Sequence, residues 1–344
     1  MKLFYFWPLI LAALLAIIVT PLVKKIAVKF NIVDRPGQRK IHHHPVPLLG
    51  GLSIFLAFSL TTGVFLLLGY ILDNKINQGQ TLAIIFGGLV LMLCGFLDDK
   101  YNLKPTQQII FPVLAALLII YSGIKIQFVT NPLGGIIKVP VYLGTVIAFF
   151  WILGMIYTTK FLDGLDGLVT GVTAVGSLII FLVSLYWDIP YSGTSILALI
   201  LAGSCLGFLF FNWYPAKIFL GEGGSVFCGF ILGTLAIISG SKIATALLIM
   251  GIPILDIIWV IIRRVWQGKS PATADRKHLN FRLLDIGLTH RQTVIFLYAL
   301  TIIFGLVSVF LHTKGKIIAL LVLTLVMFSL ALSLITLYRK NQKL

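Results

Sequence analysis

The sequence predicts an all-α polytopic membrane protein, and two observations lead to this fold class. Of the 344 residues, 59% are hydrophobic and only 11% are charged, with a mean hydropathy of +1.04. A soluble domain of this size carries about a quarter charged residues, and its interior could not hide so much apolar surface. The apolar residues also come in runs of about 20, the length that a helix needs to cross a bilayer. We therefore expect one integral membrane domain over residues 1–344.

About eleven apolar segments meet this length. The predicted transmembrane helices lie at 4–22, 49–72, 81–97, 107–123, 141–158, 165–187, 192–211, 224–240, 243–262, 292–311 and 317–338. The first segment lacks the basic start and small-residue cleavage site of a signal peptide, so an uncleaved helix is expected. Between residues 124 and 140, β-branched residues flank Asn131, Pro132 and Gly134, which predicts a short β-hairpin on the outer side.

Basic residues predict the orientation of these helices. With an outer amino terminus, 20 of the 27 lysines and arginines fall in cytoplasmic connections or in the carboxyl-terminal tail, as the positive-inside rule requires. The rule also accounts for the formal net charge of +16. No basic run is interleaved with aromatic residues as in a nucleic-acid groove, so nucleic acid is not an expected partner.

The acidic residues are sorted in the same direction, which the positive-inside rule does not explain. Only Asp73 and Asp188 are predicted to face outward. A carboxylate at a membrane boundary is costly without a partner, so a cation or a phosphate-bearing substrate is expected on the cytoplasmic face. The acids predicted to face the cytoplasm are Asp34, Asp98, Asp99, Asp163, Asp166, Glu222, Asp256, Asp275 and Asp285.

Two of the predicted cytoplasmic segments carry paired aspartates. Asp98 and Asp99 end the third predicted span. Adjacent carboxylates repel each other, so their ionised forms need a cation or hydrogen-bond donors. Magnesium suits such a pair when phosphate oxygens complete its coordination shell. The alternative is a charged helix end in water. In FLDGLDGLVTG (161–171), Asp163 and Asp166 would share one helix face, with glycines that permit close approach. The alternative there is an N-terminal cap, for which one Asp suffices.

Three further loops contain candidate ligands. Glu222, the only glutamate, lies among glycines in FNWYPAKIFLGEGGS (211–225). Glycines before a helix can cradle an anion, whereas a glutamate suits a cation. The alternative is a flexible turn. The loop 263–291 holds seven basic residues and His278. These residues could bind a diphosphate, or the loop could simply follow the positive-inside rule. In the first loop, Lys40 and His42 are predicted to contact phosphate, since the three histidines there lack metal-ligand spacing.

Taken together and in this order, these segments resemble the polyprenyl-phosphate N-acetylhexosamine-1-phosphate transferase family (glycosyltransferase family 4) from about residue 30 to 300. GFLDDKYN resembles its DDxx(D/N) motif, FLDGLDGL its DGxDGL motif, and NWYPAKIFLGEGGS its NxxPAxxFxGDxGS motif. DRPGQRKIHHHPVPLLGG is similar to its first cytoplasmic loop, PILDIIWVIIRR to a later membrane segment, and DRKHLNFRLLDIGLTHRQ to its histidine-bearing loop. The last of these is most similar to the branch that uses UDP-N-acetylglucosamine.

The resemblance implies an activity, a cofactor and partners. Such enzymes move a HexNAc 1-phosphate from a UDP-sugar to undecaprenyl phosphate with Mg²⁺, or Mn²⁺ in its place, release UMP, and so start a cell-envelope polysaccharide. It further implies a multi-pass protein of the bacterial cytoplasmic (inner) membrane, surrounded by membrane lipids, with homodimers as an expectation. The active site would face the cytoplasm and comprise the loops near 23–48, 98–106, 159–166, 212–224 and 263–291.

By the same resemblance, the site residues divide into three groups. Asp98 would position or deprotonate the lipid phosphate, with Asp99 beside it, and Asp163 and Asp166 would serve the nucleotide and metal region. The metal ligands would be Glu222, Asp99 and Asp163. Phe219 would stack on uracil, His278 and Arg282 would contact the diphosphate or sugar, and the other substrate-binding residues would be Lys40, His42, Asn102 and Asn212.

The chain departs from the family pattern at three places. Glu222 stands where the family usually has Asp, Tyr157 and Lys160 stand where it has asparagines, and Asn280 and Phe281 stand where histidines are common. A phospho-N-acetylmuramoyl-pentapeptide transferase and a non-catalytic membrane homologue are therefore the alternative interpretations. A secondary transporter is disfavoured, because its carboxylates usually lie near the bilayer midplane in repeated halves.

Overall fold

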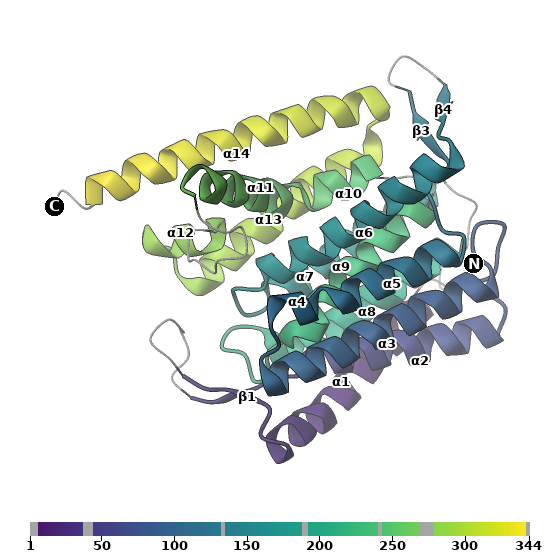
Figure 1. Ribbon diagram of the computed structural model, residues 1–344, viewed down its shortest axis with the longest axis horizontal. Helices are drawn as coiled ribbons and strands as arrows, with labels where there is room; N and C mark the ends of the chain where they lie inside the picture. Colours follow the sequence, from purple (N-terminus) through teal and green to yellow (C-terminus); the bar gives the residue numbers. More distant parts are fainter. Residues whose placement is uncertain are drawn as a thin grey trace.

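The chain folds into a bundle of long apolar helices, drawn in Figure 1. The computed structural model describes residues 6–36, 44–131, 135–187, 192–239, 243–268 and 278–341. The helices are α1 (Phe6–Lys29), α2 (Gly50–Leu67), α3 (Gln78–Tyr101), α4 (Pro105–Gln108), α5 (Ile110–Tyr121), α6 (Val141–Leu162), α7 (Leu168–Trp187), α8 (Gly193–Asn212), α9 (Gly221–Ile238), α10 (Ile243–Ile249), α11 (Gly251–Trp266), α12 (Leu279–Asp285), α13 (His290–Phe310) and α14 (Thr313–Asn341).

The all-α polytopic class is confirmed, but the predicted count of about eleven spans is only partly so. Within the described ranges, nine helices are long and apolar enough to cross a membrane, and α10 with α11 would make a tenth if the two are one bent span. The predicted span at 107–123 corresponds to the shorter apolar helix of residues 105–121. The predicted span at 243–262 is not one straight helix, because its two halves meet at 75°.

Proline explains both the bend between α10 and α11 and the break between α4 and α5. A proline inside a helix clashes with the carbonyl group four residues earlier and cannot donate to it. Pro253 stands four residues after Ile249, the last residue of α10, and Pro112 stands four residues after Gln108, the last residue of α4. Both breaks therefore fall where the ring removes a helical hydrogen bond. The break after Gln108 also places this residue at a corner facing the end of α3.

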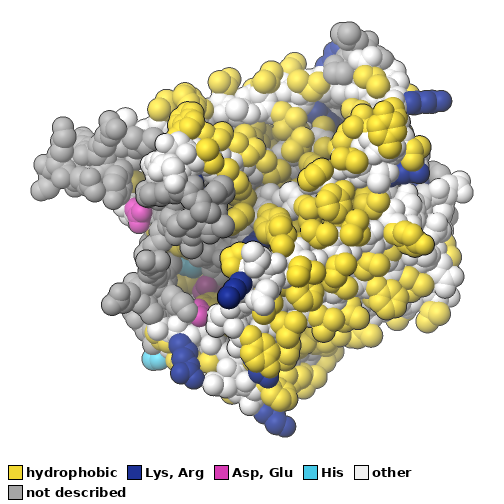
Figure 2. Space-filling view, in the orientation of Figure 1, with side chains coloured by type: hydrophobic (Ala, Val, Ile, Leu, Met, Phe, Trp, Pro, Cys, Tyr) yellow, Lys and Arg dark blue, Asp and Glu magenta, His cyan; other side chains and the backbone are white. Residues whose placement is uncertain are grey.

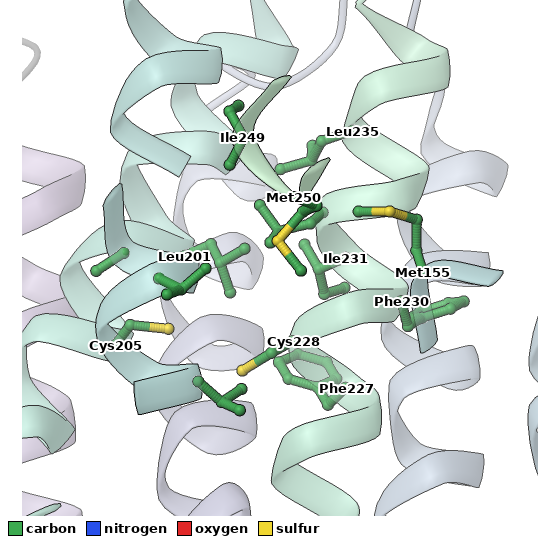
Figure 3. Packing of buried hydrophobic residues seen from close by; sticks show 14 of the residues in the cluster. Met155, Leu201, Cys205, Phe227, Cys228, Phe230, Ile231, Leu235, Ile249 and Met250 are labelled. Carbon is green, nitrogen blue, oxygen red and sulfur yellow. The ribbon is translucent and has the colours of Figure 1, made fainter. Parts of the chain in front are cut away.

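The helix α9 lies at the centre of the bundle. Almost all of its residues are buried, and it packs against α2, α3, α6 and α7. Figure 3 shows Phe227, Phe230 and Ile231 of α9 among Met155 of α6 and Leu201 of α8, side chains that fill this core. A helix that is apolar on all sides belongs in such an interior.

Glycines set how closely α2 and α3 approach the start of α9. A Cβ atom on Gly95 of α3 would lie 2.2 Å from backbone atoms of Gly223, and one on Gly51 of α2 would lie 2.1 Å from Gly224. These helices can touch backbone to backbone only because no side chain intervenes. The glycines that the sequence suggested for an anion-cradling turn at 223 and 224 therefore serve helix packing.

Two short antiparallel strand pairs complete the fold. Strands β3 (Phe128–Thr130) and β4 (Ile136–Lys138) pair with Val129 opposite Ile137, which confirms the predicted strand pairing, while its outer location stays a prediction. Strands β1 (Val33–Asp34) and β2 (Val46–Pro47) pair within the first loop and were not predicted. In Figure 1 the β3–β4 hairpin lies at one end of the bundle, whereas β1 and α12 lie at the other.

The surface agrees with a membrane environment. In Figure 2 hydrophobic side chains cover most of the middle of the visible face. Acidic and histidine side chains show near the left end, where β1, α4 and α12 lie in Figure 1. Many large apolar residues of the outer helices are exposed, including Trp7, Leu67 and Phe150. The bilayer would cover such a belt of apolar side chains, whereas exposing it to water would cost free energy.

Candidate functional site

A cavity of about 690 Å³ opens at the end of the bundle where α3, α6 and α8 end and α7, α9 and α13 begin. The five carboxylates that the sequence singled out line this one cavity, although they come from three separate motifs. Asp34 of the first loop joins them. The lining residues that carry the arguments below are Asp34, Asp98, Asp99, Lys160, Asp163, Asp166, Asn212, Tyr214, Phe219, Gly221, Glu222 and His290.

Asp99 is held against the first turn of α9. Its Oδ1 atom accepts a hydrogen bond from the backbone N–H of Glu222 at 3.2 Å. Gly221 has a φ of +75°, and a Cβ atom there would lie 2.6 Å from Oδ2 of Asp99. The position thus requires glycine twice, for its left-handed backbone and for the space that the carboxylate fills. Gly221 therefore positions the end of α3 against the start of α9.

Asp98 and Glu222 are joined by a chain of polar contacts. Oδ1 of Asp98 accepts from the Gln108 side-chain amide at 2.7 Å and from the Leu103 N–H at 2.9 Å. The Lys160 ammonium group donates to Oε1 of Gln108 at 2.6 Å and lies 2.5 Å from Oε1 of Glu222. Two departures from the family pattern, Lys160 and Glu222, are therefore ion-pair partners.

Asp163 lies where α6 ends and its side chain is exposed to the cavity. Protein surrounds the carboxyl group on the other sides, and this burial, together with the charges of Glu222, Asp99 and Asp166, raises its pKa to about 8. Within the described part of the chain, no hydrogen-bond donor reaches this carboxylate. A group in this state gains most from a cation, because a positive charge favours the ionised form.

Asp166 and Asn212 mainly organise the surrounding backbone. Oδ2 of Asp166 accepts from the N–H of Ala216 at 3.0 Å. Oδ1 of Asn212 accepts from the Gly167 N–H at 3.1 Å, and its Nδ2 donates to the carbonyl oxygen of Ile218 at 3.0 Å. These bonds tie the start of α7 to the segment between α8 and α9. Asn212 lines the cavity, but its amide is already bonded to the protein.

Phe219 forms part of a wall shared by two distant loops. Its N–H donates to the carbonyl oxygen of Pro47 at 2.8 Å, and its own carbonyl oxygen accepts from the N–H of Gly50 at 3.0 Å. The first loop is thereby joined to the segment that precedes α9. The aromatic side chain of Phe219 lines the cavity, where it can offer a flat face to a ligand.

Three of the predicted site residues, His278, Arg282 and Asn102, do not line this cavity. The buried ring of His278 stacks on Phe161, and its Nδ1 atom lies 2.8 Å from Oδ2 of Asp256. Arg282 lines a separate pocket among apolar residues. Asn102 caps the end of α3 in a left-handed conformation and is exposed. Lys40 and His42 lie outside the described residues.

Several lining residues were not among the predicted site residues, including Lys160, Tyr214 and His290. His290 begins α13, stacks on Tyr214 with ring centroids 4.1 Å apart, and is 9% exposed. Lys160 gave a weak signal in the sequence, as the lone basic residue at the end of an apolar span. His290 gave almost none, because a histidine before an apolar run commonly marks only a helix start.

The carboxylates can hold a cation only with help from a ligand. Among the described residues, no group of three or more His, Cys, Asp or Glu side chains could hold a metal ion by itself. Magnesium, however, is usually bound by one or two carboxylates and completed by water and phosphate oxygens. Asp99 and Asp163 fit that mode, since both line the cavity and neither is bonded to a basic side chain in the part of the chain that the structure describes. The site thus suits Mg²⁺ that arrives with a phosphorylated ligand.

Comparisons with known proteins identify relatives of this chain. Residues 81–240 match the family model of Glycosyl transferase family 4. The chain is 30% identical to the probable undecaprenyl-phosphate N-acetylglucosaminyl 1-phosphate transferase of Bacillus subtilis (strain 168), over 88% of this chain and 84% of that relative. It is 27% identical to the decaprenyl-phosphate N-acetylglucosaminephosphotransferase of Mycolicibacterium smegmatis, over 96% and 88%. It is 25% identical to the undecaprenyl-phosphate alpha-N-acetylglucosaminyl 1-phosphate transferase of Escherichia coli (strain K12), over 79% and 74%.

Proposed function

Because the chain belongs to glycosyl transferase family 4, we propose that it transfers N-acetylglucosamine 1-phosphate from UDP-N-acetylglucosamine to undecaprenyl phosphate. An oxygen of the lipid phosphate attacks the phosphorus that bears the sugar. The bond between that phosphorus and the oxygen of the uridine phosphate breaks, and UMP leaves. The product is a diphosphate-linked lipid that starts a cell-envelope polysaccharide.

One observation carries this proposal. Carboxylates from three motifs, which are up to about 120 residues apart in the sequence, line a single cavity at one end of an apolar helix bundle. A polyprenyl phosphate needs such a place, because its chain stays in the bilayer while its phosphate lies at the surface. A nucleotide sugar arrives from the aqueous side of the same boundary. The lysine and arginine asymmetry supports the cytoplasm as that side.

A divalent cation would resolve the charge conflict between acidic side chains and two phosphorylated substrates. Asp99 and Asp163 would hold the Mg²⁺ ion, with phosphate oxygens as further ligands. When bound, the ion would screen the negative charge that builds up during phosphoryl transfer. The protein then has little covalent chemistry to perform, and its residues mainly orient the two phosphates.

The other lining residues fit distinct parts of the two substrates. Asp98, held by Gln108 and by the Leu103 N–H, would orient or deprotonate the lipid phosphate. Asp166 would serve the nucleotide side of the site, as the resemblance of its motif to the family implies. The ring of Phe219 would stack on uracil, an interaction worth about 1–3 kcal/mol for a base on an aromatic side chain.

The test is a panel of UDP-sugars offered to the purified, full-length protein in detergent with undecaprenyl phosphate and Mg²⁺. We expect radiolabelled sugar to pass into organic solvent and UMP to appear only when both substrates are present, with UDP-N-acetylglucosamine as the preferred donor. Asp98→Asn and Asp163→Asn should abolish both signals. A well-folded protein that releases no UMP with any UDP-HexNAc would instead favour a non-catalytic homologue. Preference for UDP-N-acetylmuramoyl-pentapeptide would move the chain to the peptidoglycan branch, and solute uptake by proteoliposomes without lipid product would indicate a transporter.

A further inference from the structure

Lys160 is the one lysine or arginine among the described residues that line the acidic cavity. It lies in the last turn of α6, three residues before Asp163, and its side chain is 21% exposed. The cavity receives six carboxylate groups and this single cation from the described residues. Its position therefore matters for how the negative charges around it are balanced.

The contacts of Lys160 use only part of its hydrogen-bonding capacity. A lysine ammonium group has three N–H donors. One donates to Oε1 of Gln108 at 2.6 Å, and another points to Oε1 of Glu222 at 2.5 Å. The third remains for a group inside the cavity that Lys160 lines. Gln108 itself is fixed, since its amide nitrogen is bonded to Asp98 and its oxygen to Lys160.

Glu222 is correspondingly less available to a divalent cation. Its Oε1 atom faces the ammonium group, and its own backbone N–H is bonded to Asp99. A metal ion placed on the same oxygen would meet Lys160 at short range, and like charges in a partly buried site repel strongly. Asp99 and Asp163, by contrast, are bonded to no basic side chain of the described ranges.

We propose that Lys160, anchored by Glu222 and Gln108, is a phosphate-binding residue of this site, and that Glu222 is its counter-ion rather than a ligand of the divalent cation. The inference rests on the proposed transferase function, because it assumes phosphorylated ligands in the cavity. The third N–H of Lys160 binds a phosphate oxygen of the sugar donor or of the lipid acceptor. Asp99 and Asp163 then carry the cation.

The first experiment counts bound metal without turnover. The full-length protein in detergent is titrated with Mn²⁺ in the presence of UDP-N-acetylglucosamine and no lipid, and free Mn²⁺ is read from its paramagnetic resonance signal. We expect Glu222→Gln to bind Mn²⁺ within about twofold of the wild type, and Lys160→Met to bind it at least as tightly. Asp163→Asn should weaken binding at least about tenfold, since even changes behind a metal ligand cost 10- to 100-fold.

The second experiment locates the phosphate that Lys160 binds. Losing a hydrogen bond from a charged donor should weaken substrate binding about tenfold or more. If the donor sugar is the ligand, Lys160→Met raises the Kd for UDP-N-acetylglucosamine; if the lipid is the ligand, it raises the KM for undecaprenyl phosphate. The matched control is Lys217→Met, which removes an exposed lysine that does not line the cavity and should change neither value.

Each outcome decides the proposal. Loss of Mn²⁺ binding in Glu222→Gln to the extent seen in Asp163→Asn would make Glu222 a metal ligand and overturn it. Unchanged Kd and KM values in Lys160→Met would equally overturn it. If Lys160→Met does not fold because Glu222 is left unpaired, the double variant Lys160→Met/Glu222→Gln removes both charges and is read the same way.

The failure of the proposed function would look different. In that case the wild type releases no UMP from any UDP-sugar, whereas the Mn²⁺ titration and the donor Kd can still be measured. A protein without transferase activity could thus still keep Glu222 as the partner of Lys160. An active enzyme could equally show that Glu222 binds the metal.

Discussion

Acidic residues at the two ends of the bundle have different surroundings. Asp73 lies at the end where α3 begins, five residues before Gln78. Its Oδ1 atom accepts from the N–H groups of Lys75 and Ile76 at 2.6 and 2.8 Å, and its Oδ2 atom accepts from the N–H of Gly193 at 2.7 Å. Asp163, at the other end of the bundle, faces a cavity and is reached by no donor among the described residues.

The difference separates a structural carboxylate from one that can bind a ligand. Three N–H groups satisfy Asp73 and tie its loop to the start of α8, so nothing further is needed to hold its charge. Asp163 has other carboxylates nearby and a pKa of about 8, so its charge is satisfied only when a cation arrives. The sequence distinguished the two residues by their predicted side of the membrane and by the motif around Asp163, but not by their contacts. Substitutions at both ends of the bundle, and a change of pH, test this difference.

The largest effect is expected from Asp163→Asn. The amide keeps the size of the side chain but removes the charge that would hold the cation, so UMP release should fall by about 100-fold or more, as for other electrostatic groups of active sites. The thermal unfolding midpoint should stay the same or rise, because a charge in a crowded acidic site is removed. An active Asp163→Asn enzyme would show that this carboxylate is not required.

A smaller loss is expected when α3 is pushed away from α9 near the cavity. Gly95→Ala would place a methyl group 2.2 Å from the backbone of Gly223, so the protein should lose about 1–3 kcal/mol of stability as in other overpacked sites. Activity should fall as well, since Asp98 and Asp99 are carried by the same helix. Thermal unfolding and UMP release measure the two effects.

The matched control for this change lies toward the far end of α2. A Cβ atom on Gly63 would have no atom within 4 Å, so Gly63→Ala should keep full activity. Its stability should rise slightly, since alanine is the better helix former by about 1 kcal/mol. Equal losses in Gly95→Ala and Gly63→Ala would argue against the close approach at the cavity.

Asp73→Asn should give the opposite pattern to Asp163→Asn. One of the two acceptor oxygens becomes an NH₂ group, which leaves at least one backbone N–H near Gly193 or Ile76 without its acceptor, at a cost of about 1–3 kcal/mol. The unfolding midpoint should fall while UMP release per folded molecule stays unchanged. A loss of turnover without a loss of stability would show that the far end contributes to the reaction.

The last expected effect is a dependence of stability on pH. A carboxyl group whose pKa is raised by folding takes up a proton relative to the unfolded chain, so its contribution to stability is complete below pH 4 and is lost as pH rises to about 8. In EDTA, the midpoint of the wild type should therefore fall relative to Asp163→Asn between pH 6 and pH 8, and the gap should stop widening above that. Parallel curves would show that the Asp163 carboxyl is ionised throughout this range.

Much of the site could be predicted because its residues come in short motifs at the ends of apolar runs. Asp98, Asp99, Asp163, Asp166 and Glu222 were all predicted from sequence and share one cavity. The motifs do not show which of these side chains are already bonded to other groups of the protein. Asn212 is bonded to residues 42 and 45 positions away, and Lys160 contacts residues 52 and 62 positions away in the sequence. No local pattern signals a pairing at such a distance.

From its sequence alone this chain could be identified as a multi-pass membrane protein, and most of its helices could be located. The length and polarity of a span are local properties, and they decide whether a segment is stable in the bilayer. The sequence also determined that the acidic motifs sit at helix ends, since charges are excluded from the apolar interior. The contact of Lys160 with Glu222, and the lack of a hydrogen-bond donor at Asp163 among the described residues, followed from the packed structure alone. The physical reason is that these features depend on which helices pack together, and packing joins residues that the chain keeps far apart.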